Sequence, residues 1–594
     1  MFFIGSIYLK GRITMTQNTD DFYHVPHSEI GLTANSVAEI CQWRGENQPD
    51  MVAYRFLHNG LDEYEELTYA ELLLRMRVIS ASFSPVSEGL EADRALLVFP
   101  SGLDYITSFY ACLYGGVTAV PAYPMLSHSD SIRLRVIIND CKPRYILTNS
   151  ALKDRLLSWL KQENLSPDAF DIIVVDELGI YAGQSHSIDT QKIAFLQYTS
   201  GSTGNPKGVI VPNRNLVHNS GVIYRKFGHT PNSEVVSWLP PFHDMGLVGG
   251  IIQPLFGGFT SNIMSPMTFL RRPMRWLQAI SRYGATSSGG PNFSYKLCLK
   301  HHNEKQMKDV DLSSWQVAFN GAEPIQSQTL KDFAAVFSRY GFKKETMYPC
   351  YGLAEATLFI SGCDSGRAYK TVNVDKTALQ SHQVILTEPG HESRELVSTG
   401  DVLENQVLIV DPSSQKVLGE KQIGEIWLAG ESIADGYWKK PVETEDIFQA
   451  YTSDGKGPFA RTGDYGFFDG KELFVTGRLK ELIIVNGKNY FPSDIENTVQ
   501  SVSPALRADS GAAISIDQDS EQLIIVQEIE RSWQRKVELQ ELKEQIVAQC
   551  FEQHAIRPGE VVIVEQSTIP KTTSGKVKRL QVKNNYLQGS YSSL

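Results

Sequence analysis

The sequence Tyr198-Thr199-Ser200-Gly201-Ser202-Thr203-Gly204-Asn205-Pro206-Lys207-Gly208 brings glycines, hydroxyls and one lysine together in a single loop. Glycines let a backbone turn back and present successive N–H groups to an anion, hydroxyls add donors, and lysine adds a positive charge. Apolar runs at 193–196 and 209–211 predict a strand on each side. The spacing is not that of the common P-loop, because no Gly-Lys-Ser/Thr closes it. Taken alone, such a loop is more often a plain turn than a phosphate site.

Five more short segments follow in a fixed order along the chain. They are Asn320-Gly321-Ala322-Glu323-Pro324, Tyr351-Gly352-Leu353-Ala354-Glu355-Ala356-Thr357, Arg461-Thr462-Gly463-Asp464, Gly477-Arg478-Leu479-Lys480-Glu481 and Pro570-Lys571-Thr572-Thr573-Ser574-Gly575-Lys576. Together with the first loop, this order resembles the adenylate-forming superfamily of acyl-CoA synthetases, peptide-synthetase adenylation domains and luciferase. The resemblance covers nearly the whole chain, and it implies ATP and Mg²⁺ as cofactors.

Three further segments resemble the fatty acyl-AMP ligases within that superfamily. They are Trp238-Leu239-Pro240-Pro241-Phe242-His243-Asp244-Met245-Gly246-Leu247, Gly289-Gly290-Pro291-Asn292-Phe293 and Leu358-Phe359-Ile360-Ser361. Such ligases activate a fatty acid as its adenylate and pass it to an acyl carrier protein, and most do not make acyl-CoA. The resemblance therefore implies two partners, a fatty acid and either an acyl carrier protein or the carrier domain of a polyketide or peptide synthase.

The composition predicts a multidomain globular protein. The chain has 594 residues, of which 42% are hydrophobic and 21% are charged. Its net charge of −11 argues against a nucleic-acid partner. Seven scattered cysteines without a Cys-x-x-Cys pair predict neither disulfides nor structural zinc, and favour the cytoplasm. The apolar region 95–120 is broken by Pro100, Asp104 and paired glycines, so no integral membrane association is expected.

The N-terminal residues leave two interpretations open. Residues 1–9 are apolar, but they lack a preceding basic flank and a following small-residue cleavage site. Met15 is an alternative start, which would make residues 1–14 an upstream extension.

Alternating apolar runs and amphipathic stretches predict an α/β fold with two domains. Residues 1–480 are expected to form a large N-terminal adenylation domain, and residues 481–594 a smaller, mobile α+β C-terminal domain. The elements predicted are strands at 96–99, 172–175, 482–485, 512–516, 523–526 and 561–564, and helices at 69–82 and 539–551. The segment 364–405 resembles an insertion that fatty acyl-AMP ligases carry and acyl-CoA synthetases lack, although a long surface loop is the alternative.

The chemistry implied by the resemblance is attack of a carboxylate oxygen on the α-phosphate of ATP. Because the substrate is its own nucleophile, catalysis depends on positioning and on cations around the transferring phosphorus. Lys576, in a loop containing Gly575, is expected to bridge the two anions. The alternative is that Lys571, Lys576, Lys578 and Arg579 form a solvated basic patch, and this remains the favoured interpretation for Lys578, Arg579 and Lys583.

The resemblance also assigns residues to the nucleotide. The phosphate-binding residues are Thr199, Ser200, Gly201, Ser202, Thr203, Gly204 and Lys207, of which Thr203, together with Glu355, is expected to hold Mg²⁺ and to act in catalysis. Asp464 is expected to accept both ribose hydroxyls and Arg478 to share that contact. The adenine is expected to lie against Gly321, Ala322, Glu323, Tyr351 and Gly352.

The remaining assignments concern the acyl chain and the hinge. Trp238, Met245, Gly246, Gly250 and Gly290 are expected to line an apolar tunnel in which the glycines leave room for the chain. His243 is a catalytic candidate that either gates the site or contacts pyrophosphate, although a simply packed histidine is the alternative. Lys480 is expected to be the hinge for rotation of the small domain.

Two other functions share part of this pattern. An acyl-CoA synthetase would carry the same motifs for the first half-reaction. A catalytically dead, nucleotide-binding regulator is disfavoured because Lys576, Glu355 and Asp464 are all present.

Overall fold

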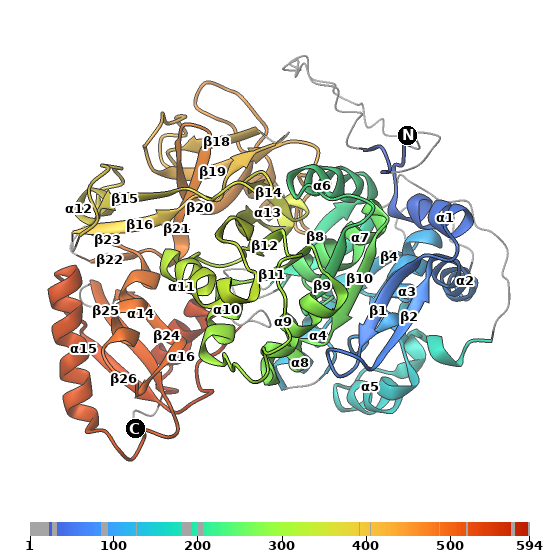
Figure 1. Ribbon diagram of the computed structural model, residues 1–594, viewed down its shortest axis with the longest axis horizontal. Helices are drawn as coiled ribbons and strands as arrows, with labels where there is room; N and C mark the ends of the chain where they lie inside the picture. The colour runs from blue at the N-terminus through green and yellow to red at the C-terminus, as the bar shows by residue number, and fades with distance from the viewer. Residues whose placement is uncertain are drawn as a thin grey trace.

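The computed structural model describes residues 23–26, 33–84, 93–125, 128–179, 193–199, 206–390, 392–403, 406–485, 488–517, 521–571, 576–591 and 594. Two sheets form the centre of the large N-terminal part (Figure 1). The first has six strands in the order β6-β5-β3-β4-β7-β8, and all neighbours are parallel except β7 and β8. Its strands are β3 (Arg94–Leu97), β4 (Thr118–Pro121), β5 (Tyr145–Thr148), β6 (Asp171–Val174), β7 (Ile193–Thr199) and β8 (Lys207–Pro212).

The antiparallel pair β7–β8 is the strand–loop–strand unit predicted for the glycine-rich segment. Thr199 pairs with Lys207 across it, so the two ends of the loop are held side by side. The parallel strands predicted at 96–99 and 172–175 are likewise confirmed as β3 and β6.

The second sheet has nine strands in the order β17-β14-β13-β12-β11-β9-β10-β1-β2. The central run from β13 to β1 is parallel, and antiparallel strands close both edges. Its strands are β1 (Val52–Leu57), β2 (Tyr64–Thr68), β9 (Glu234–Ser237), β10 (Thr260–Met264), β11 (Ser287–Gly290), β12 (Val317–Asn320), β13 (Met347–Gly352), β14 (Phe359–Gly362) and β17 (Asp401–Val402).

Helices cover the faces of these two sheets. They are α1 (Val37–Asn47), α2 (Tyr69–Ser80), α3 (Leu103–Tyr114), α4 (His128–Cys141), α5 (Ser150–Gln162), α6 (Asn213–Lys226), α7 (Gln253–Gly257), α8 (Pro266–Arg271), α9 (Met274–Tyr283), α10 (Asn292–Lys300) and α11 (Ser327–Phe337). Helix α2 confirms the predicted helix. Its N-terminus carries a capping box in which Thr68 accepts from the Glu71 N–H while the Glu71 side chain accepts from the Thr68 N–H.

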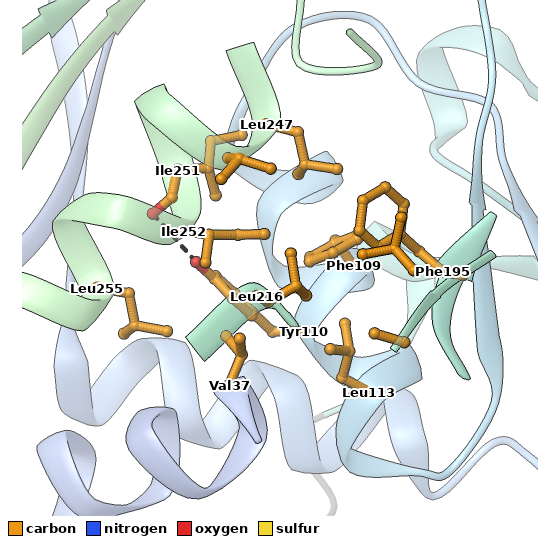
Figure 2. Packing of buried hydrophobic residues seen from close by; sticks show 14 of the residues in the cluster. Val37, Phe109, Tyr110, Leu113, Phe195, Leu216, Leu247, Ile251, Ile252 and Leu255 are labelled. Atoms are coloured by element: carbon orange, nitrogen blue, oxygen red, sulfur yellow. Dashed lines mark hydrogen bonds between the residues drawn. The ribbon is translucent and has the colours of Figure 1, made fainter. Parts of the chain in front are cut away.

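The main core lies where α3 packs between the sheets, in contact with β1 of one and with β3 and β4 of the other. Figure 2 shows Phe109 and Tyr110 of α3 packed below Leu247 and Ile251 of the π-helix η4 (Met245–Ile252). The Tyr110 hydroxyl donates to the Ile251 carbonyl at 3.2 Å (Figure 2). This buried packing fixes the segment that directly follows His243.

A third region follows, built on a four-stranded antiparallel sheet of order β18-β19-β20-β21. Its strands are β18 (Gln406–Val410), β19 (Gly424–Ala429), β20 (Ala460–Asp469) and β21 (Glu472–Arg478), with helix α13 (Pro441–Phe448) beside them. The described part of the segment 364–405 is ordered. It contains the hairpin β15 (Thr371–Asp375) with β16 (Ser393–Val397), the helix α12 (Lys376–Gln380) and the edge strand β17.

The C-terminal part is a separate α+β unit with its own core. Its elements are β22 (Ile483–Val485), β23 (Lys488–Tyr490), α14 (Pro492–Ser501), β24 (Leu506–Asp517), β25 (Glu521–Ile529), α15 (Leu539–His554), β26 (Glu560–Val564) and α16 (Arg579–Leu587). All four predicted strands and the helix are found in it. On α15, Leu542, Ile546 and Cys550 are buried, whereas Phe551 is half exposed. Within the described chain, none of the helices has the length and apolar character needed to cross a membrane.

Candidate active site

Several predicted site segments follow parallel strands of the nine-stranded sheet. In the register of this sheet Gly290 lies beside Asn320, and Asn320 lies beside Pro349. The carboxyl ends of β11, β12 and β13 therefore lie along one edge, and ligands of open parallel sheets bind at such edges. The segments that begin at Pro291 and Gly321 meet there with the loop that carries Glu355.

Asp464 lies on β20 opposite Arg478 of β21, and only 7% of it is exposed. Arg478 donates through Nε to Oδ1 of Asp464 at 3.2 Å, and the Tyr351 hydroxyl donates to Oδ2 at 2.8 Å. The charge of Asp464 raises the pKa of Arg478. Each carboxylate oxygen has a further lone pair, so the group can still accept from a pair of hydroxyls. The structure thus brings three of the predicted nucleotide residues together.

Glu355 lies in a short 3-10 turn after β13 and contacts Tyr437, a residue outside the motifs predicted from the sequence. The Tyr437 hydroxyl donates to its Oε1 at 2.8 Å. Burial raises the pKa of Glu355, and the Tyr437 hydrogen bond opposes that rise. The ammonium of Lys207 lies 5.1 Å from the centre of the same Tyr437 ring. Tyr437 therefore connects the end of the glycine-rich loop with Glu355.

Glu323 is the third carboxylate of the site. Its Oε1 accepts the backbone N–H of Phe293, in the first turn of α10, at 2.6 Å. Burial raises the pKa of Glu323 to about 7. The preceding residue, Ala322, has φ of 67°, a conformation that a residue with a Cβ adopts at a cost. Such strain is typical of functional loops, and here it turns the loop at the carboxyl end of β12.

Lys576 comes from the C-terminal unit but lies among groups of the N-terminal part. Burial and the nearby Arg478 lower the pKa of Lys576, while the charges of Glu323, Asp244 and Asp464 oppose that shift. Three carboxylates from different segments of the large part are thus close enough to Lys576 for their charges to influence its pKa. The sequence predicts that Lys576 reaches the site, but it does not show which side chains of the large part lie near it.

The two parts of the chain are joined by polar contacts, and Figure 1 shows α10 and α11 beside the C-terminal unit. The contacts are Lys296–Asp509 at 2.9 Å, Lys300–Glu530 at 2.9 Å, Gln326–Asn497 at 2.9 Å and Arg394–Asp494 at 3.1 Å. Arg394 also lies over the ring of Phe491, 4.7 Å from its centre. Since Arg394 belongs to β16, the 364–405 segment itself contacts the C-terminal unit.

One sequence interpretation is wrong. Arg579 was expected to be solvated, but it is 17% exposed and pairs with Glu496 and Glu481, each at 2.6 Å. Lys571, another member of that patch, donates to the Ser510 hydroxyl at 2.7 Å. Both side chains therefore support the C-terminal unit internally. Their partners are distant in sequence, so composition alone gave no sign of them.

His243 and Asp244 follow β9 and lie near the same carboxylates. The Nδ1 atom of His243 is 2.6 Å from Oδ1 of Asp244. Asp244 is close enough to Glu355 and Lys576 to influence the pKa of each. Asp244 has no role among the residues predicted from the sequence, although its position directly after a candidate catalytic histidine is a usable signal.

Aromatic rings surround Trp238, the first residue after β9. Phe269 stacks on it with ring centres 4.0 Å apart, and Phe293 meets it edge-on at 6.0 Å. Met245 is buried at the start of η4. These side chains form an apolar wall beside the site.

The glycines of this wall do not leave the room that was expected. A Cβ at Gly246 would lie 2.0 Å from the Pro240 carbonyl oxygen, one at Gly250 2.8 Å from the Ser237 hydroxyl, and one at Gly290 2.5 Å from the Trp238 ring. Protein atoms already fill the space beside each of them. These three glycines therefore permit close packing of neighbouring segments, and any room for a chain lies elsewhere along the wall.

Part of the predicted site lies outside the described residues. This applies to Ser200, Gly201, Ser202, Thr203 and Gly204 of the loop, whereas Thr199 and Lys207 at its ends are described. The backbone of Lys480 lies in a 3-10 turn, Leu479–Glu481, between the last strand of the four-stranded sheet and β22. Gly321 and Gly352 occupy tight positions, where a Cβ would lie 3.0 Å from the Cys350 carbonyl and 1.7 Å from the Leu358 carbonyl.

Comparison with known proteins places the chain in a family. A sequence model described as AMP-binding enzyme matches residues 41–438, and one described as Disco-interacting protein 2-like, AMP domain, matches residues 480–594. The first match alone spans more than half of the chain, so the protein belongs to the AMP-binding enzyme family. The α/β fold class predicted from the sequence is confirmed, with a large N-terminal and a smaller C-terminal domain.

Several relatives within the family are similar to this chain over almost their whole length. The medium-chain-fatty-acid–[acyl-carrier-protein] ligase JamA of Moorena producens is 38% identical over 94% of this chain and 96% of its own. The long-chain-fatty-acid–AMP ligase FadD26 of Mycobacterium tuberculosis is 34% identical over 95% of this chain and 99% of its own. The crystal structure of a fatty acid AMP ligase from Legionella pneumophila superposes with a TM-score of 0.74, at 36% identity over 95% of this chain and 98% of that one.

Proposed function

We propose that this protein activates a fatty acid with ATP, forming acyl-AMP and pyrophosphate, and then transfers the acyl group to the phosphopantetheine of an acyl carrier protein. The observation that carries the proposal is the position of Lys576. A cation supplied by the C-terminal domain lies among Glu323, Asp244 and Asp464 of the N-terminal domain. That is where an adenylate-forming enzyme has to bring a carboxylate and a phosphate together. The names of the relatives support the same conclusion, since JamA is a fatty-acid–[acyl-carrier-protein] ligase and FadD26 a fatty-acid–AMP ligase.

In the first half-reaction, a carboxylate oxygen of the fatty acid attacks the α-phosphorus of ATP. The bond from this phosphorus to the bridging oxygen breaks, and pyrophosphate leaves. Lys576 is the group that neutralises the charge shared by the two anions, because it comes from the C-terminal domain and lies near carboxylates of three segments of the N-terminal domain. Lys207 and the glycine-rich loop, from Thr199 onward, hold the departing phosphates. Catalysis is then mainly preorganised electrostatics and positioning.

The nucleoside is positioned by the charge network around Asp464. With Arg478 and Tyr351 holding the carboxylate in place, Asp464 accepts the two ribose hydroxyls. Adenine stacks beside Tyr351 and the strained loop at Ala322. The tight packing at Gly321 and Gly352 keeps that loop close to the strand ends.

Mg²⁺ would be held by Glu355 together with Thr203. Glu355 suits a hard cation, because Tyr437 binds one carboxylate oxygen and the other makes no hydrogen bond within the described residues. Across the described part of the chain, there is no group of three or more His, Cys, Asp and Glu side chains arranged to hold a metal. One carboxylate plus phosphate oxygens and water is the usual protein share in such sites. When bound, the cation would neutralise charge on the phosphates.

Transfer requires a second arrangement of the two domains, 1–480 and 481–594, with Lys480 as the hinge. The 364–405 segment acts on this movement. It packs Val372, Val374 and Leu396 into a cluster with Phe491, and Arg394 pairs with Asp494. These contacts favour the adenylate-forming arrangement. A docked carrier protein can compensate for their loss, whereas free CoA offers fewer contacts.

A product assay tests the proposal. The protein is incubated with ATP and a panel of radiolabelled fatty acids, with either CoA or a phosphopantetheinylated carrier protein added. We expect acyl-AMP without acceptor, acyl-carrier with the carrier protein, and little acyl-CoA. Turnover of CoA as fast as adenylate formation would make the protein an acyl-CoA synthetase instead.

The seven free cysteines also lead us to propose the cytoplasm as its compartment, because thiols persist under reducing conditions.

A further inference from the structure

The pair His243–Asp244 has a geometry that the adenylation step does not use. Besides the 2.6 Å contact between Nδ1 and Oδ1, the Met245 N–H donates to the same carboxylate oxygen at 2.7 Å and lies 3.4 Å from Nδ1. The side chains of His243 and Asp244 are 25% and 14% exposed. The pair is thus largely enclosed but still reachable from the site.

The carboxylate of Asp244 determines which ring nitrogen of His243 carries the proton. Burial would raise the pKa of Asp244, but His243, the Met245 N–H and Lys576 hold it below its usual value. An ionised carboxylate only accepts hydrogen bonds, so Nδ1 of His243 must be the donor. In the neutral ring, Nε2 is then the nitrogen that can accept a proton. An acidic residue orients histidine in the same way in hydrolytic triads.

The backbone around the pair is fixed from several sides. The His243 N–H donates to the Pro240 carbonyl at 3.1 Å, and its own carbonyl accepts from Leu247 at 2.8 Å. The Tyr105 hydroxyl binds the Pro241 carbonyl at 2.8 Å, and the Gln197 amide binds the Phe242 carbonyl at 3.0 Å. All of these partners belong to the large domain. Rotation of the small domain would withdraw Lys576 and leave the pair in place on the large domain.

The charged groups that face the pair within the described chain come from both domains. Lys576 acts on Asp244 from the small domain, and Glu355 interacts with Asp244 from the turn after β13. Arg478 and Glu323 in turn act on Lys576. Withdrawal of Lys576 therefore removes a cation that acts on Asp244, while Glu355 of the large domain stays near the pair.

The two half-reactions differ in their need for a base. In the first, the nucleophile is a carboxylate that is already ionised, so no proton moves. In the second, a thiol attacks, and the thiolate is the reactive form. A proton must leave sulfur as the carbon–sulfur bond forms and the carbon–oxygen bond to AMP breaks.

From this geometry we infer that His243 is the general base of the transfer step and that Asp244 is its positioning residue. Nε2 of His243 takes the proton from the phosphopantetheine thiol. The sulfur forms a bond to the acyl carbon, and AMP departs with the electron pair of the broken carbon–oxygen bond. This inference rests on the proposed function, because it needs the acyl-AMP that the first half-reaction makes.

The test separates the half-reactions. Adenylation is followed by pyrophosphate release without a carrier, and transfer by single turnover of supplied acyl-AMP onto a phosphopantetheinylated carrier, from mildly acidic to mildly alkaline pH. His243→Gln should slow transfer by at least about 10²-fold more than adenylation. Its transfer rate should keep rising with pH toward the ionisation of a free thiol, roughly 8.5, whereas the wild-type rate levels off at lower pH. Asp244→Asn should also slow transfer, since an amide can donate to Nδ1 and favour the wrong tautomer.

Two controls keep the result interpretable. Lys576→Ala should fail at adenylation yet transfer supplied acyl-AMP, and imidazole added to His243→Ala should restore part of the transfer rate. Equal losses in both half-reactions with an unchanged pH profile would overturn the inference and make His243 a nucleotide contact. Unchanged transfer would also overturn it, with the phosphate of the leaving AMP as the base. Absence of pyrophosphate release from the wild type would instead refute the proposed function.

Discussion

Lys576 is a cation that one domain carries into the carboxylates of the other. Its neighbours Glu323, Asp244 and Asp464 come from three separate segments, and its pKa is lowered by burial and by Arg478. The site is therefore organised around single charges whose partners are distant in sequence.

Replacing Lys576 by alanine should largely abolish adenylate formation and leave the fold intact. The loss of one preorganised contact to the transition state typically costs about 2.7–4 kcal/mol, or on the order of 10²–10³ in rate. Pyrophosphate release is the measurement, and thermal melting checks the fold. Lys583→Ala, which removes the same charge from α16 of the same domain, is the matched control and should behave as wild type. Undiminished pyrophosphate release from Lys576→Ala would contradict the assignment.

Replacing Asp464 by alanine should weaken ATP binding much more than fatty-acid binding. The ribose contact exists in both ground and transition states, so its loss should appear mainly as a higher KM for ATP. Calorimetric titration of ATP and of fatty acid measures the two effects separately. Tyr351→Phe removes one of the hydrogen bonds that hold Asp464 and should give a smaller change in the same direction. An unaltered nucleotide affinity in Asp464→Ala would rule out the ribose assignment.

At the scale of elements, α10 links the site to the domain interface. Its first turn donates to Glu323, while Lys296 and Lys300 further along it pair with Asp509 and Glu530 of the C-terminal domain. One helix thus contacts both the active-site carboxylate and the moving domain. Its lysines are four residues apart, so they lie on the same face.

Reversing the charge in Lys296→Glu should reduce adenylation without reducing transfer from supplied acyl-AMP. The pair is partly exposed, so its loss corresponds to about 0.2–1 kcal/mol, and like charges at 2.9 Å add to the penalty. A decrease of several-fold in pyrophosphate release is expected, and it should be weaker at high salt. The swapped double variant Lys296→Glu with Asp509→Lys should recover most of the rate. Failure of the swap to restore any activity would show that Lys296 acts by some other contact.

At the scale of the whole molecule, the balance between two domain arrangements decides the product. The 364–405 segment acts on that balance only if it binds the adenylate-forming arrangement better than the thioester-forming one. Arg394, through Asp494 and the ring of Phe491, is a described contact of this kind. A bias of about 2.7 kcal/mol would keep the second arrangement near one per cent, because roughly 1.4 kcal/mol is tenfold.

Shortening the 364–405 segment should therefore raise acyl-CoA output while adenylation persists. The milder change Arg394→Ala should move the product ratio in the same direction by a smaller amount. Chromatography of labelled products, with CoA present in excess, measures the ratio of acyl-CoA to acyl-AMP. If both variants keep the wild-type ratio, the segment does not control the acceptor.

The sequence by itself determined the fold class, the order of the motifs and those strands and helices whose apolar pattern is clear. Those features depend on local patterns: apolar periodicity gives β3, β6, α2 and α15, and the glycine-rich run implies a turn between paired strands. The family's motif order added the candidate residues, because each motif can be read without knowing its spatial neighbours.

Only the tertiary structure decided which of these residues meet and with what partners. Tyr437 binding Glu355, Asp244 binding His243 and Glu496 binding Arg579 all depend on how the chain folds or on a side-chain direction that composition does not encode. The glycines near Trp238 show the same limit: the sequence suggested open space, and packing fills it with neighbouring atoms. Burial and electrostatics then set the charge of each group, and these arise from the sum of many distant contacts, which no local sequence pattern contains.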